Sequence, residues 1–174
     1  MLAYVFVVLA IAVRFMPHPW TFTPVTACLL YFGARGPRRF IWAPLAMLAA
    51  SDVVLTKWFW HYAFTWDQFV VWAWYAAVLM LGTRLRENSK PLWILASALG
   101  SSVSFYLLSN FAVWASFNMY PKNFAGLIAC YTAALPFYRY APIGDMLFTA
   151  AMFAVPMLMS SFAEKASSGP PAAA

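Results

Sequence analysis

Two apolar segments near the start of the chain are joined by Arg14-Phe-Met-Pro-His-Pro-Trp-Thr-Phe-Thr-Pro24. Three prolines fall within eight residues of this stretch, and they exclude a regular helix because proline lacks the amide hydrogen that a helix needs. The stretch nonetheless carries Arg14, His18 and Trp20. Non-helical backbone near membrane depth persists only inside the protein or beside a wet cavity. The stretch is therefore either the lid or wall of a site, or a plain connection with Trp20 at the membrane interface.

The composition is typical of a polytopic membrane protein. Of the 174 residues, 64% are hydrophobic and only 9% are charged, whereas a soluble domain has about 25% charged residues. We expect one transmembrane domain over residues 1–165 and a disordered tail over residues 166–174, which are rich in Ala, Ser, Gly and Pro. The net charge of +6 falls mostly in two loops, which indicates membrane orientation and not nucleic-acid binding.

The apolar runs predict an all-α fold, a polytopic bundle of six transmembrane helices. The spans are expected at residues 1–15, 22–34, 40–56, 69–83, 91–115 and 142–162. The first two spans are short for a hydrocarbon layer about 30 Å thick, so the stretch between them must cover the missing depth. Residues 124–138 form a further short apolar run. We expect an interfacial or re-entrant helix there, and a seventh span is the alternative.

Two basic turns, residues 35–39 and 84–90, indicate the orientation of the chain in its membrane. Loops rich in Lys and Arg stay in the cytoplasm. Both termini are therefore cytoplasmic in the six-span arrangement, whereas a seventh span would move the C-terminus to the outside. Membrane lipids are the expected surroundings in either arrangement.

The intramembrane polar residues are expected to converge in the outer half of the bundle. Asp52 lies ~18 Å along the third span and Asn110 ~28 Å along the fifth, both counted from the cytoplasmic side. Arg14 ends the first span and Asp145 opens the last. Two of the three loops on the same side add the two histidines of the chain and four tryptophans. We therefore predict one outward-facing pocket, with binding residues Arg14, His18, Trp20, Asp52, Trp60, His61, Asn110 and Asp145.

Each of these residues also has a structural interpretation. Asp145 could stabilise a helix N-terminus, and Asp52 could pair with Arg14 only to hold two spans together. The two histidines could be interface residues. We expect Arg14 to pair with Asp52 or Asp145, because a buried ionisable group needs a partner.

No catalytic or cofactor motif accompanies the polar residues. Both histidines lie in loops, which disfavours haem ligation, and no Gly-x-Ser-x-Gly nucleophile motif occurs in the chain. Cys28 and Cys130 lie in apolar segments without a Cys-x-x-Cys motif, so neither a metal site nor a redox dithiol is predicted. We expect no enzyme activity, no metal and no cofactor.

Several motifs are distributed over almost the whole chain. They are Arg14-Phe-x-Pro-His-Pro-Trp-x-Phe-Thr-Pro24, Ser51-Asp52, Leu108-Ser-Asn-Phe111 with Trp114, Tyr120-Pro-Lys-x-x-x-Gly-Leu-Ile-Ala-Cys-Tyr131, and Pro136-Phe137 with Gly144-Asp145. In these motifs the chain resembles a family of small, uncharacterised bacterial integral membrane proteins. That family in turn resembles the substrate-binding S components of energy-coupling-factor vitamin transporters. The resemblance implies six spans, a location in the bacterial inner membrane and an outward pocket capped by the first loop. It also implies a small-molecule substrate and transporter coupling subunits as partners.

Two functions therefore remain open. The first is a substrate-binding component of a small-molecule uptake transporter. The second is an accessory or assembly subunit of a larger membrane complex, in which the polar residues only hold the helices together. A pocket of several hundred cubic ångströms beneath the first loop would favour the first function. A solid outer half would favour the second.

Overall fold

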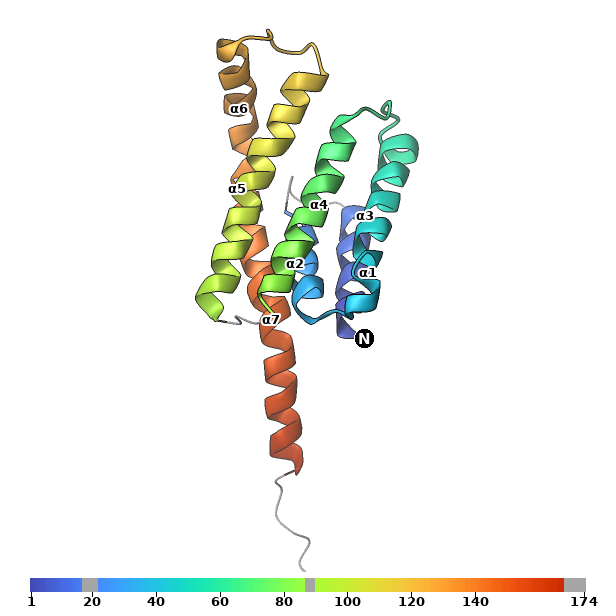
Figure 1. The fold of residues 1–174 in the computed structure, drawn as a ribbon, viewed down its shortest axis with the longest axis vertical. Coiled ribbons are helices and arrows are strands. Elements are labelled where there is room, and N and C mark those ends of the chain that lie inside the picture. Colours follow the sequence, from blue (N-terminus) through green and yellow to red (C-terminus); the bar gives the residue numbers. More distant parts are fainter. Residues whose placement is uncertain (17–21, 87–89, 168–174) are drawn as a thin grey trace, which may run out of the picture.

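The computed structural model describes residues 1–16, 22–86 and 90–167, and within these ranges the fold is all-α, as predicted, with no strand. The helices are α1 (Leu2–Arg14), α2 (Val25–Arg35), α3 (Ala43–Val54), α4 (Asp67–Arg84), α5 (Pro91–Ser116), α6 (Phe124–Tyr138) and α7 (Tyr140–Ser167). A short 3-10 turn, η1 (Arg38–Phe40), precedes α3, and a π-helical turn, η2 (Leu55–Phe59), continues it. Figure 1 shows the helices running side by side in a bundle.

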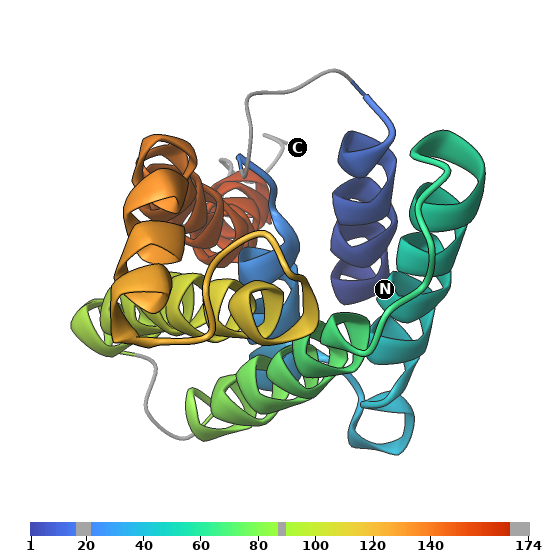
Figure 2. The same cartoon turned by 90° about the horizontal axis from the view of Figure 1, so that it is seen from above.

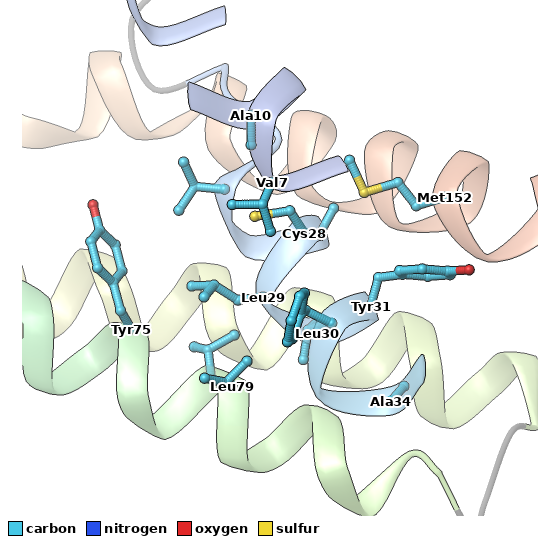
Figure 3. Packing of buried hydrophobic residues seen from close by; sticks show 14 of the residues in the cluster. Val7, Ala10, Cys28, Leu29, Leu30, Tyr31, Ala34, Tyr75, Leu79 and Met152 are labelled. Atoms are coloured by element: carbon cyan, nitrogen blue, oxygen red, sulfur yellow. The ribbon is translucent and has the colours of Figure 1, made fainter. Parts of the chain in front are cut away.

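Helix α2 lies at the centre of the bundle, and α1, α4, α5 and α7 contact it (Figure 2). All of its residues from Val25 to Ala34 are buried. Figure 3 shows side chains of α2, among them Leu29 and Leu30, packed between those of α1, α4 and α7. A helix that is apolar on every side is stable only when neighbours enclose it, and the four surrounding helices supply that enclosure.

A pair of glycines allows α2 and α4 to approach closely. A Cβ atom on Gly33 would lie 2.8 Å from the Cα atom of Gly82 and would also collide with the backbone oxygen of Leu79. Small residues at a crossing let two helix backbones come within contact distance, which increases their van der Waals packing. The α2–α4 crossing therefore depends on these two glycines.

The two basic turns lie together at one end of the bundle. The guanidinium of Arg86, after α4, donates to the backbone oxygens of Gly33 (3.0 Å) and Gly36 (2.5 Å), at the end of α2. It thereby satisfies carbonyl groups that a helix C-terminus leaves unpaired. The N-terminus lies at the same end, and α7 runs past that end (Figure 1).

Two stretches of the described chain are long and apolar enough to cross a membrane. They are Arg38–Phe59, with 22 residues, and Pro91–Ser116, with 26. We expected six membrane-crossing helices, whereas only two stretches of the described residues meet this criterion of length and composition. For α1, α2 and α6 the reason is length, since they have 13, 11 and 15 residues, whereas a span needs about 20.

Two helix boundaries also differ from the prediction. The third apolar segment was expected to end at Thr56, but η2 carries the helix on to Phe59. In addition, α6 and α7 are separated by a single residue, Arg139, and α7 continues in the direction of α6 alongside α5 (Figure 1). The short apolar run 124–138 is therefore a helix packed against α5.

Candidate ligand-binding site

A cavity of about 260 Å³ lies between α1, α2, η2, α4, α5 and α7. Its volume is more than ten times the roughly 10–15 Å³ that a single water molecule requires. Arg14, Thr26 and Asp145 supply polar groups to its wall, and four aromatic side chains supply much of the rest. The cavity lies at the end of α1 and the start of α2, where both helices stop while α3, α4 and α5 continue (Figure 1).

Arg14 and Asp52 form a buried ion pair beside the cavity, which confirms one of the two predicted pairings. The Arg14 guanidinium also donates to Ser51 Oγ at 2.7 Å, and the Trp72 indole donates to the Asp52 carboxylate at 3.0 Å. Only 12% of the Arg14 side chain and 6% of the Asp52 side chain are exposed. The network joins α1, α3 and α4, and it neutralises the charge of Arg14.

Asp145 lies on the opposite wall and has different neighbours. The hydroxyl groups of Thr26 and Ser102 interact with its carboxylate, although Ser102 Oγ makes no hydrogen bond of regular geometry. The residue is buried, with 6% of its surface exposed. The described residues place no Lys, Arg or His within ion-pair distance of it. Asp145 is therefore a buried carboxylate without a charged partner in the described part of the chain.

The position of Asp145 also excludes one structural interpretation. Helix α7 begins at Tyr140, and its first turn contains no acidic residue. The stabilising effect of a helix N-terminus on a carboxylate is confined to the first turn. Asp145 therefore does not serve as an N-terminal residue of the last helix, contrary to the alternative drawn from the sequence.

Aromatic rings form a large part of the cavity wall. Trp74 lies next to the ring of Phe105, at a centroid distance of 4.8 Å, and next to that of Tyr75, at 5.9 Å. The Trp74 indole donates to Ser104 Oγ at 3.0 Å, which holds the ring in place. Trp60, just after η2, adds a fourth ring from the other side. The wall therefore offers fixed aromatic surfaces around the two charged positions.

The predicted site residues are only partly brought together. Arg14, Trp60 and Asp145 line the cavity, and Asp52 holds Arg14 in position. His61 is exposed after η2, with a positive φ of 54°, and does not line the cavity. The predicted lid residues His18 and Trp20 lie outside the described residues.

Asn110 is a second predicted residue that the structure places outside the cavity. Its amide donates to the backbone oxygen of Tyr106 at 2.8 Å, and its own backbone oxygen accepts a contact from Cys130 Sγ at 3.5 Å. Asn110 therefore lies at the contact between α5 and α6, and it does not line the cavity with Asp145.

The sequence reasoning missed several wall residues, among them the polar or aromatic residues Thr26, Trp74, Tyr75 and Phe105. One available signal was the spacing of Trp72 and Tyr75, three residues apart on one face of α4. Both side chains carry a hydrogen-bond donor, and both reach the Asp52 carboxylate, at 3.0 Å and 3.5 Å. The spacing of Trp72 and Tyr75 therefore indicated which face of α4 contacts the Arg14–Asp52 ion pair.

Metal binding finds no support in the described residues, which contain no group of three or more His, Cys, Asp or Glu side chains able to hold an ion. Cys28 and Cys130 are both buried and are not joined to each other. The chemistry that the site offers is therefore that of one ion pair, one unpaired carboxylate and several aromatic rings.

Comparison with known proteins gives a family and no named relative. No curated protein and no solved structure matches the chain. The match to a family covers residues 1–167, which include every helix and every residue of the cavity wall. The chain belongs to a family of unknown function (DUF6580).

Proposed function

We propose that this chain is an integral membrane protein that binds a small molecule in the cavity between Arg14 and Asp145. The observation that carries the proposal is the cavity itself. Its volume of about 260 Å³ is close to the lower end of the range of about 300–1,000 Å³ for ligand pockets. It is mostly apolar and aromatic with a few polar groups, which is the usual composition of such pockets.

The outer surface of the bundle supports the membrane location. Large apolar side chains are exposed along α5, α6 and α7, among them Leu107, Phe111, Ile128 and Leu147. Soluble monomers rarely expose contiguous apolar surface of this kind. The two apolar stretches long enough to cross a membrane add to this support.

A six-crossing arrangement follows if α6 and the start of α7 together make one crossing. Helices α1 to α5 would make the other five, with neighbouring helices covering the short α1 and α2. The two basic turns and the N-terminus lie at one end of the bundle, and loops rich in Lys and Arg stay in the cytoplasm. We therefore propose that both termini are cytoplasmic and that the cavity opens toward the outside.

The proposed role is that of a substrate-binding component of an uptake transporter. It draws on the resemblance to S components, whose pocket lies beneath the loop between the first two spans. The cavity beside Arg14 and Thr23 lies at the two ends of that loop. We propose transporter coupling subunits as partners, and ligand binding without catalysis as the activity.

An accessory subunit of a larger complex is the second candidate. The observation that favours it is the Arg14–Asp52 pair, because the two charges satisfy each other inside the protein. In that role the pair would only hold helices together. The cavity weighs against this alternative, since a purely structural core is close-packed.

Native mass spectrometry of the purified full chain tests the binding function. We expect a small molecule to co-purify and to be lost from Ala141→Phe, because Ala141 lines the cavity. Ala129→Phe is the matched control, since Ala129 lies exposed on α6, and it should keep the molecule. If no small molecule is found on any variant, or if Ala141→Phe retains it, the accessory role takes precedence.

A further inference from the structure

The two charged residues of the cavity wall differ in how they are compensated. Arg14 is paired with Asp52 and also donates to Ser51. The carboxylate of Asp145 meets only hydroxyl groups, those of Thr26 and Ser102, among the described residues. A buried charge is costly unless it is paired. In the described part of the chain, the Asp145 carboxylate therefore has no positively charged partner.

The hydroxyl groups near Asp145 do not remove this requirement. They can donate hydrogen bonds to a carboxylate, but they carry no net charge. Ser102 Oγ, moreover, makes no hydrogen bond of regular geometry, although it is buried. Neither hydroxyl group therefore supplies the positive charge that would pair with a buried carboxylate.

The aromatic wall has the properties that a bound cation requires. Trp60, Trp74, Tyr75 and Phe105 all line the same cavity as Asp145. The faces of aromatic rings carry negative charge density and attract ammonium groups. Because Trp74 and Tyr75 are themselves buried, each about 5% exposed, a cation beside them would be shielded from water, which strengthens the attraction.

Arg14 does not make the cavity selective for anions. Its guanidinium is in contact with the Asp52 carboxylate, so an incoming anion would compete with a partner already in place. The same anion would be repelled by Asp145 across the cavity. The balance of charge at the wall therefore favours a positive ligand.

We infer that the cavity binds a small organic cation, with its ammonium group at Asp145 and its alkyl part against Trp60, Trp74 and Phe105. This inference rests on the proposed binding function and specifies its ligand class. Primary amines and quaternary ammonium compounds both belong to that class, since both carry a permanent or protonated ammonium centre beside apolar carbon.

Isothermal titration calorimetry on the detergent-solubilised full chain tests the inference with probes matched in shape. The first set is n-butylammonium, butan-1-ol and butyrate, which differ in charge at the end of similar short chains. The second set is choline and its neutral counterpart 3,3-dimethylbutan-1-ol. We expect the cation of at least one set to bind about 30-fold or more tightly than its neutral partner, because loss of one member of a buried charge pair costs at least that much.

Two substitutions locate the effect at Asp145. Asp145→Asn should remove the preference for the cation, whereas Asp145→Glu, which keeps the charge, should retain part of it. Asp67→Asn is the matched control, because Asp67 lies in the first turn of α4 and does not line the cavity, and it should bind the cation as the unaltered chain does. Thermal unfolding of each variant shows whether it is folded.

The outcomes distinguish the inferred preference for a cation from the proposed binding of a small molecule, on which it rests. Equal binding of cation and neutral partner, tighter binding of butyrate, or undiminished cation binding by folded Asp145→Asn would each overturn the inference. It is also overturned if neither cation binds at millimolar concentration. In all of these cases the binding function still stands if Ala141→Phe loses a co-purified small molecule.

Discussion

Removal of the Asp52 carboxylate should destabilise the protein more than any other single loss of charge. In Asp52→Ala the guanidinium of Arg14 loses its ionic partner, and the Trp72 indole loses its acceptor. Both side chains of the pair are largely buried, 12% and 6% exposed, so water cannot replace the missing contacts. Breaking a buried pair in this way costs about 3–5 kcal/mol, a large part of a total stability of about 5–15 kcal/mol.

Reversible unfolding in mixed micelles gives the free energy of unfolding for the four members of a double-mutant cycle. Asp52→Ala and Arg14→Ala should each show a large loss. The double variant should lose less than the sum, by about 0.5–3 kcal/mol, because the second substitution removes a charge that the first has already left unpaired.

A control separates the ion pair from a general effect of removing a carboxylate. Asp67→Ala removes an acidic residue from the first turn of α4, where it should cost only about 0.3–1 kcal/mol. If the losses in the cycle are additive, or if Asp52→Ala costs no more than Asp67→Ala, the pair does not stabilise the bundle and the reasoning from burial is wrong.

Three further predictions concern the crossing of α2 and α4, the hydrogen bonds of Arg86 and the orientation of the chain in the membrane. Gly33→Ala should lower the free energy of unfolding by about 1–3 kcal/mol, because the added Cβ atom would meet the backbone of α4. Gly100→Ala should raise the free energy of unfolding by about 0.5–1 kcal/mol, because nothing lies within 4 Å of its added Cβ atom. A thermal-unfolding comparison that reverses this order would contradict the close α2–α4 crossing. Arg86→Ala should lower the free energy of unfolding by about 1.5–3 kcal/mol, since the hydrogen bonds of Arg86 to the end of α2 are charge-assisted. Arg84→Ala should change it by no more than about 0.5 kcal/mol, because Arg84 is exposed. Equal chemical-denaturation midpoints for the two variants would refute this role of Arg86. Reporter fusions at either terminus should both report cytoplasm, and a periplasmic signal at the C-terminus would exclude the six-crossing arrangement.

The sequence allowed an ion pair of Arg14 with either Asp52 or Asp145, and the grouping of the basic turns, to be predicted, because both rest on rules with few alternatives. A buried charge in an apolar chain has few partners available: the whole sequence has only five acidic residues. Loops rich in Lys and Arg likewise gather on one side of a membrane. Depth along a helix follows directly from the rise per residue.

The rotation of a helix about its axis could not be predicted in the same way. Ser102 and Asn110 both lie on α5, eight residues apart, a spacing that places two residues near the same side of a helix. Eight residues at 3.6 per turn leave an angular difference of about 80°. That difference is enough for Ser102 to reach Asp145 while Asn110 faces α6. Because α5 is apolar on most of its surface, its periodicity did not reveal which face is internal.

The cavity and the short helices have a common origin in the proline-rich stretch. Prolines between residues 17 and 24 separate the end of α1 at Arg14 from the start of α2 at Val25, and neither helix extends as far as α3, α4 and α5 do (Figure 1). The space above two truncated helices must be filled by side chains, by the connecting stretch or by a ligand, since packed interiors contain few voids. Arg14 and Thr26 border the cavity at these two truncated ends. The same prolines that exclude a continuous helical hairpin therefore account for the cavity and for the charged and polar groups of Arg14 and Thr26 in its wall.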